Sequence, residues 1–201
     1  MQRLLSEIRI AGFGGQGVIL AAVVIGKAEA IFHGGYACMT QSFGPEARGG
    51  SSSAQVILSS EPILYPYVAR PDVLVVMSQE AYRKFGPQLK PGGILITEQE
   101  LVQVGEAPRG VRMYGVPATR LAEELGRKMV LNIVMVGFFG AVTNLLDPDA
   151  LRKAVADSVP PAMQKLNLQA FDKGFEYGAT LVERLAEKSE EGEPVSMETE
   201  S

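Results

Sequence analysis

Apolar positions in the first half of the chain follow strand and helix periods in turn. Alternation over Glu7–Ala11 predicts a first strand, and Val18–Ile31, apolar or small on nearly every face, predicts a largely buried helix that two glycines end. Tyr36–Phe43 and Ser53–Leu58 predict two strands that are joined by a loop instead of a helix. This part of the sheet can therefore be antiparallel.

The second half of the chain alternates short strands with helices. The apolar run VLVVM after Asp72 predicts a buried strand of the parallel kind. Two more strands are expected at Ile94–Thr97 and Val111–Val116. Helices are expected at Gln79–Leu89, Pro117–Leu125, Val130–Leu146, Asp149–Ser158 and Pro161–Lys188.

This order of elements is typical of an α/β fold. We expect a Rossmann-like three-layer sandwich, with a mostly parallel sheet and helices on both faces. A chain of 201 residues suits one such domain. The domain should span residues 1–188, and the acidic, polar tail at 189–201 should be disordered.

Composition excludes several classes of protein. A formal charge of −4 without a Lys/Arg run argues against nucleic-acid binding. The lone Cys38 excludes an intrachain disulfide, a CxxC motif, and an iron–sulfur cluster held by this chain alone. The chain start lacks a signal-peptide pattern, and Met129–Leu146, interrupted by Asn and Gly, reads as a buried helix rather than a membrane span. We expect a cytoplasmic protein.

A glycine-rich turn between the first strand and helix is the first candidate site. Its glycines fit the pattern G-x-G-x-x-G. Glycine allows positive φ and close backbone approach, and the N–H groups that open the helix point at whatever lies above the turn. The candidate contacts to a phosphate or cofactor are Gly12, Gly14, Gly15, Gln16 and Gly17.

Three interpretations of this turn stay open. It is a tight turn that only packs the helix on the sheet, an anion or cofactor contact, or a dinucleotide site. A dinucleotide site needs an acidic residue at the end of the second strand, where this chain has Met39-Thr40-Gln41-Ser42. A phosphate-binding P-loop is excluded because no Gly-Lys-Ser/Thr follows the turn.

The PEARGG loop, Pro45–Gly50, is the second candidate site. Arg48 offers five donors suited to a carboxylate or phosphate, and glycines and serines surround it. Either Arg48 pairs with Glu46 or Asp72 on the surface, or it contacts a ligand or a partner chain.

Other residues offer no visible catalytic set, so we assign neither catalytic residues nor a metal site. His33, the only histidine, is interpreted as a helix cap. Cys38 is interpreted as a core residue because no second histidine is present to activate it. Asn132 makes an interchain or helix–helix hydrogen bond, or satisfies a backbone group.

The order of motifs resembles the gamma subunit, or gamma domain, of the 2-oxoacid:ferredoxin oxidoreductases. The resemblance extends to about Leu185 and includes GFGGQGV, QSFGPEARGG, EPILYP, PDVLVVMSQEA, LKPGGILI and VLNIVMVGFFGA. GFGGQG and PEARGGSS are similar to the 2-oxoglutarate and ketoisovalerate (branched-chain) types, and we favour 2-oxoglutarate.

The resemblance implies a complex that converts a 2-oxoacid and coenzyme A to acyl-CoA, carbon dioxide and reduced ferredoxin, with succinyl-CoA as the product from 2-oxoglutarate. Thiamine diphosphate and magnesium would lie between the alpha and beta subunits, and the iron–sulfur clusters in a beta or ferredoxin-like delta subunit. This chain alone would then bind no cofactor. Its partners would be those subunits and, through the complex, ferredoxin. The reverse reaction, reductive carboxylation, is also open to such a complex.

The resemblance and the two loops together leave two function classes. In the first, the chain is an accessory subunit, inactive alone, whose glycine turn or Arg48 contacts coenzyme A phosphates or the substrate carboxylate. In the second, it is a freestanding nucleotide- or coenzyme A-binding module that uses the G-x-G-x-x-G turn. Its apolar late helix also predicts self-association as a homodimer when partners are missing.

Overall fold

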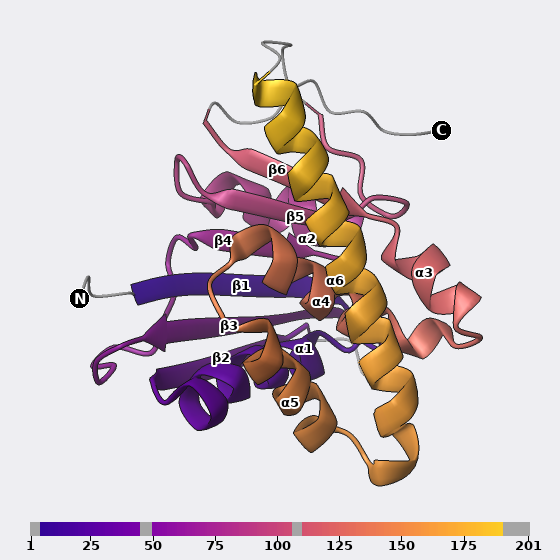
Figure 1. Cartoon of the computed structure of the whole chain (residues 1–201). Coiled ribbons are helices and arrows are strands. Elements are labelled where there is room, and N and C mark those ends of the chain that lie inside the picture. Colours follow the sequence, from indigo (N-terminus) through magenta and orange to yellow (C-terminus); the bar gives the residue numbers. More distant parts are fainter. Residues whose placement is uncertain (1–4, 45–49, 106–109, 191–201) are drawn as a thin grey trace.

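The structure is a computed structural model that describes residues 5–44, 50–105 and 110–190. A six-stranded sheet forms its centre, in the spatial order β2-β3-β1-β4-β5-β6 (Figure 1). The strands are β1 Leu5–Phe13, β2 Tyr36–Phe43, β3 Ser51–Ser59, β4 Val73–Val76, β5 Ile94–Glu98 and β6 Arg112–Val116. The α-helices are α1 Val18–Lys27, α2 Gln79–Phe85, α3 Ala118–Glu124, α4 Leu131–Thr143, α5 Pro148–Ser158 and α6 Pro161–Glu190.

The sheet is mixed. β1, β4, β5 and β6 are parallel to one another, whereas β3 runs antiparallel to both β1 and β2. The α/β fold and the antiparallel segment predicted from the sequence are both confirmed. For β2 and β3 the cause is local, since only residues 44–50 separate them and so short a connection favours antiparallel pairing.

One face of the sheet carries most of the helices. Ile8 and Ile10 of β1 and Val56 of β3 lie in one buried cluster with residues of α1, α4 and α5. Figure 1 shows α5 and α6 in front of the sheet and α2 behind it. Most residues of α4 are buried, so the predicted buried helix is confirmed. No described helix has both the length and the apolar character that a membrane span requires.

The opposite face has a thinner cover. α2 and a 3₁₀ turn, η2 (Gly86–Gln88), pack there on β1, β4 and β5, around Leu74, Val76 and Leu95. An irregular connection, residues 60–72, joins β3 to β4 without a helix. Pro62, Pro66 and Pro71 lie in this connection, and proline disfavours regular helix and strand there.

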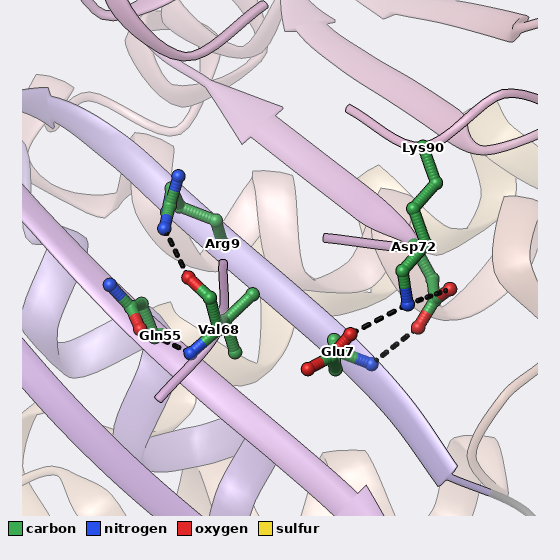
Figure 2. Close-up of polar contacts among 6 residues, drawn as sticks. All are labelled: Glu7, Arg9, Gln55, Val68, Asp72 and Lys90. Carbon is green, nitrogen blue, oxygen red and sulfur yellow. Dashed lines mark hydrogen bonds and ion pairs between the residues drawn. The ribbon is translucent and has the colours of Figure 1, made fainter. Parts of the chain in front are cut away.

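A cross-strand pair of side chains holds this connection in place, as Figure 2 shows. Arg9 and Gln55 lie opposite each other in β1 and β3. The Arg9 Nη2 donates to the Val68 carbonyl at 2.6 Å, and the Val68 N–H donates to Gln55 Oε1 at 2.8 Å. Arg9 is buried over the Phe85 ring, and burial lowers the pKa of its guanidinium. Both backbone groups of buried Val68 are thereby satisfied.

An ion-pair cluster fixes the amino ends of the strands. Lys90 Nζ lies 2.6 Å from Glu7 Oε2 and 2.8 Å from Asp72 Oδ1 (Figure 2). The Glu7 N–H also donates to Asp72 Oδ2 at 2.8 Å. Burial disfavours the Lys90 ammonium, but the hydrogen bonds that it donates to Asp72 and Glu7 outweigh that cost and raise the pKa of Lys90. The cluster joins β1, β4 and the turn before β5.

Most element ends differ from the sequence-based expectation by one to three residues; for example, α4 ends at Thr143 instead of Leu146. The helix predicted over Val18–Ile31 turns from α-helix to a π-helical turn, η1 (Ala28–His33), which Gly34 ends at φ 84°. α2 stops at Phe85 and continues only as η2. α6 extends to Glu190, two residues into the predicted tail; residues 191–201 lie outside the described residues.

Candidate functional site

The two candidate motifs meet at the carboxyl end of β1. The Gly14 N–H donates to the Gly50 carbonyl at 2.8 Å, and Gly44 N–H donates to the Ser51 carbonyl at 2.7 Å. Both ends of the PEARGG loop are thus fixed beside the glycine turn. Residues 45–49, with Arg48 among them, lie outside the described residues. The two motifs were expected to share one edge of an α/β sheet, and the antiparallel pairs β2–β3 and β1–β3 bring the described parts of both to that edge.

Gln16 holds the glycine turn from within. Its Oε1 accepts from the Phe13 N–H at 2.6 Å, and its Nε2 donates to the Met77 carbonyl at 2.8 Å. A Cβ on Gly12 would come within 2.5 Å of that same Oε1. Gly12 therefore makes room for the Gln16 side chain, whose amide joins the turn to Met77, the residue after β4.

Gly17 lies where the turn enters α1. It caps the helix with φ 72°, and a Cβ there would come within 2.5 Å of Asn132 Nδ2. Asn132 is buried on α4 and donates to the Gly17 carbonyl at 3.2 Å. Of the roles left open for Asn132, the structure shows the hydrogen bond to a backbone group. This bond ties the start of α1 to α4.

The top of the turn offers backbone donors. Gly15 is exposed with φ 96°, and a Cβ there would meet nothing within 4 Å. No described residue accepts from the N–H groups of Gly15, Val18 or Ile19. The first turn of α1 carries no acidic residue. Free N–H groups at the positive end of a helix suit a phosphate or carboxylate.

Of the two strands beside β1, the antiparallel strand β3 disfavours a dinucleotide site. In a dinucleotide fold that neighbour is parallel and ends in an acid that binds the ribose. Here the neighbour is β3, which runs the opposite way and places Ser52 opposite Gly12 and Ser51 opposite Phe13. Serine hydroxyls thus stand where that fold has a carboxylate, and the end of β2 lies one strand further away.

Two polar residues at the same edge of the sheet were missed from the sequence. Glu98, fully buried at the end of β5, accepts from the Leu101 N–H at 2.7 Å and from the Thr119 N–H at 3.0 Å. The Thr119 hydroxyl is buried without a partner among the described residues. An acidic residue directly after an apolar strand is the signal that could have found Glu98.

The remaining candidates fall outside this edge. His33 is exposed at the end of η1, before Gly34. Cys38 is free and half-buried in β2. Asp72, considered above as a partner of Arg48, is bound by Lys90 at the amino ends of the strands. Within the described part of the chain, no group of three or more His, Cys, Asp or Glu residues could hold a metal.

Comparison with known proteins defines the family. Residues 7–177 match the family described as pyruvate ferredoxin/flavodoxin oxidoreductase. The chain belongs to this family. Within it, the chain is 48% identical over 176 residues to the 2-oxoglutarate synthase subunit KorC of Methanothermobacter thermautotrophicus, covering 85% of this chain and 93% of that one. Identity to the pyruvate synthase subunit PorC of the same organism is 32% over 175 residues, with coverage of 85% and 94%.

Solved structures from the family share this architecture. The gamma subunit of a keto/oxoacid ferredoxin oxidoreductase from Geobacter sulfurreducens superposes with a TM-score of 0.77 at 37% identity, covering 87% of this chain and 99% of that one. The 2-oxoglutarate:ferredoxin oxidoreductase of Magnetococcus marinus, solved with 2-oxoglutarate, coenzyme A and succinyl-CoA, gives a TM-score of 0.75 at 27% identity. That match covers 90% of this chain but 32% of the other, so the domain also occurs within a longer chain.

Proposed function

We propose that the chain is the gamma-type subunit of a 2-oxoglutarate:ferredoxin oxidoreductase complex. The proposal rests on the difference between the sequence identities of this chain to two subunits from one organism. The chain is 48% identical to the 2-oxoglutarate synthase subunit and 32% identical to the pyruvate synthase subunit, over nearly equal lengths. The reaction is conversion of 2-oxoglutarate, coenzyme A and oxidised ferredoxin to succinyl-CoA, carbon dioxide and reduced ferredoxin.

In this proposal the chain works inside an assembly in the cytoplasm. Thiamine diphosphate, magnesium and iron–sulfur clusters belong to alpha, beta and ferredoxin-like subunits. The Magnetococcus relative, in which the matching region is part of a longer chain, supports a role joined to other parts of an enzyme. The chain alone is expected to be inactive.

The glycine turn is the part of the chain that we assign to an anion. The open N–H groups of Gly15 and of the first turn of α1 fit a coenzyme A phosphate or a substrate carboxylate, because no described acceptor uses them. Arg48 would add a charged fork from the adjoining loop. Gly12, Gly14 and Gln16 shape the turn, since the donors or side-chain groups described for them are bonded within the protein.

Purification from the native host tests the assignment. The tagged chain would be isolated without oxygen and assayed with several 2-oxoacids, coenzyme A and a dye that accepts electrons. We expect thiamine- and cluster-bearing subunits to copurify and 2-oxoglutarate to give the fastest dye reduction. A chain that emerges alone, or a complex that prefers pyruvate, would contradict the proposal.

Variants of the assembled complex test the anion site. Gly15→Asp puts a negative charge at an open, positive-φ position, and we expect it to raise the KM for coenzyme A or for 2-oxoglutarate. Gly92→Asp is the matched control, because Gly92 is also open with φ 76° but lies in the turn after Lys90. Arg48→Ala, with exposed Arg184→Ala as its control, tests the second motif. Unchanged KM values in Gly15→Asp and Arg48→Ala would remove the site role.

Calorimetry distinguishes the subunit from the alternative function, a freestanding nucleotide-binding module. A freestanding nucleotide-binding module would bind coenzyme A, NAD(P) or FAD without other subunits. We expect no heat of binding for NAD(P) or FAD with the isolated chain, because the acid that holds a ribose is replaced by the start of β3. Tight binding of a dinucleotide would favour the module over the subunit.

A further inference from the structure

The free edge of the sheet lacks the features that usually protect an edge strand. β2 reads YACMTQSF, without a charged residue or a proline. It pairs with β3 one residue to one residue from Tyr36 to Phe43, so no bulge twists it away. On its other side, its N–H and C=O groups pair with no other strand in the described part of the chain. Proteins commonly blunt such an edge with charge, proline or a bulge, because it can pair with another strand.

The helix beside this edge is also apolar on its partly exposed side. A Cβ on Gly26 of α1 would lie 3.8 Å from the Ala37 Cβ, so α1 lies over β2. Ile19 and Val23 share the stripe of Gly26 by helical spacing, and both are only half-buried. α1 carries no charge before Lys27, which is bound to Asp157 of α5 at 2.8 Å. The edge and its helix form one uncharged surface.

Large exposed side chains lie at both ends of this surface, on the same face of the sheet. At the end of β2, Phe43 is 64% exposed; it shares the α1 face with Met39 because alternate residues point the same way. Before the start of β2, Ile31 and Phe32 of η1 are 59% and 37% exposed. η1 continues α1 and contacts β2. Exposed apolar side chains therefore lie at both ends of β2, on the face of the sheet that α1 covers.

We propose that β2 pairs antiparallel with β2 of a second copy of this chain, with Met39 near a two-fold axis. Such an axis is perpendicular to the sheet and keeps α1 of both copies on one side. It places α1 beside α1, and Phe43 of each copy beside Ile31 and Phe32 of the other. One symmetry operation thus covers the free edge, the apolar stripe and both exposed ends.

A second copy fits this surface better than an unrelated strand. An isologous contact requires a surface that complements itself. The two ends of β2 are apolar on the same face, and the surface between them has no charge that would repel its own image. The pairing joins two six-stranded sheets into one. It goes beyond the proposed function and does not depend on it.

The mass of the full chain in solution tests the pairing. Sedimentation should give a dimer, twice the mass of one chain. Thr40→Lys puts like charges beside the axis, and Val23→Lys puts them between the two α1 helices; both side chains are half-buried, so each variant should fold and sediment at half the native mass. Thr180→Lys, the same change at an exposed position of α6, should remain a dimer. Circular dichroism of each variant checks folding.

Hydrogen exchange supplies a second measurement that needs no variant to fold. We expect slow exchange over residues 36–43 in the native chain and faster exchange when dilution separates the copies. A native chain that is monomeric at all concentrations would overturn the proposal, as would dimers that persist in both lysine variants. Protection of β2 that arises only after other subunits are added would also overturn it, and would assign the edge to one of them. Each of these results is independent of enzyme activity.

Discussion

The glycine turn shows how few of its residues remain free for a ligand. Gln16 and Asn132 each bond to its backbone, and Gly12 and Gly17 leave the space that these two side chains occupy. The sequence pattern predicted a glycine-rich turn, but not which of its residues shape the turn and which stay open to a ligand. Gln16 reaches Met77 and Asn132 reaches Gly17 across long stretches of chain, and such contacts are not visible in local spacing. Gly15 keeps the open backbone position that the pattern implies.

A pair of alanine variants separates backbone strain from crowding in this turn. Gly15→Ala should cost about 1–2 kcal/mol, the usual penalty for a side chain at positive φ. Gly17→Ala should cost more, because its Cβ would also collide with Asn132. Urea unfolding of both variants measures the difference. Equal losses would show that Asn132 moves aside freely.

A buried acid in the π-helical turn makes stability depend on pH. Glu29 is 4% exposed, and burial raises the pKa of its carboxyl while the nearby His33 charge lowers it. The folded protein therefore holds this proton more tightly than the unfolded chain, so stability falls as pH rises from the unfolded pKa through the folded one. Glu29→Gln should raise Tm near neutral pH, and this gain should vanish in acid.

Thermal unfolding across pH tests the role of Glu29, with Glu183→Gln on the exposed side of α6 as control. The control should follow the native protein at every pH. A Glu29→Gln variant that melts below the native protein at neutral pH would show that the carboxylate has a stabilising partner.

At the scale of elements, the pattern predicted which segments are strands and helices, and missed features set by contacts from elsewhere. β2 was expected over the residues it occupies, and α4 was expected as a buried helix. The pattern could not order the strands, because a hairpin that pairs with β1 and one that lies apart share the same periodicity. The π-helical turn was missed as well, since apolar residues continue through it.

The side chains of Arg9 and Gln55 form a clamp on the backbone of Val68. This clamp predicts a local effect on the connection between β3 and β4. Gln55→Ala leaves the buried Val68 N–H without its acceptor and should cost about 1–3 kcal/mol. Exchange of the Val68 amide and proteolysis within residues 61–70 should both become faster. Gln164→Ala, which removes a similar bond to the Ala156 carbonyl, should leave this segment unchanged. A uniform loss of protection across the sheet would contradict a local clamp.

Across the whole molecule, polar groups divide between the two ends of the sheet. The carboxyl ends hold the glycine turn with its open donors, whereas the amino ends hold the paired charges of Lys90, Glu7 and Asp72. The motifs in the sequence predicted the family, and the comparisons confirm that prediction. The site residues stay a prediction, because Arg48 and its neighbours at 45–49 lie outside the described residues.

Removing Lys90 tests the amino-end cluster. Lys90→Met should lower stability by about 1 kcal/mol or less at neutral pH, as is usual for partly exposed pairs. The folded pKa of Lys90 lies above the unfolded value, so this contribution is present below the unfolded pKa and is lost as pH rises through the folded one. Native and variant Tm values should therefore converge in strong alkali. A constant difference would point to lost packing instead of charge.

The central place of β1 has a consequence for the order of synthesis. β1 precedes the other described strands in the chain, yet its neighbours are β3 and β4, and α4 packs in the same cluster with Ile8 and Ile10. A nascent chain that stops before Leu131 carries the strands with α1 and α3 but lacks α4, α5 and α6, so part of that apolar face is uncovered. Such chains should aggregate or recruit a chaperone, whereas chains that include α4 should not. The apolar face of β1 is therefore fully covered only after α4, which follows much later in the chain, has been synthesised.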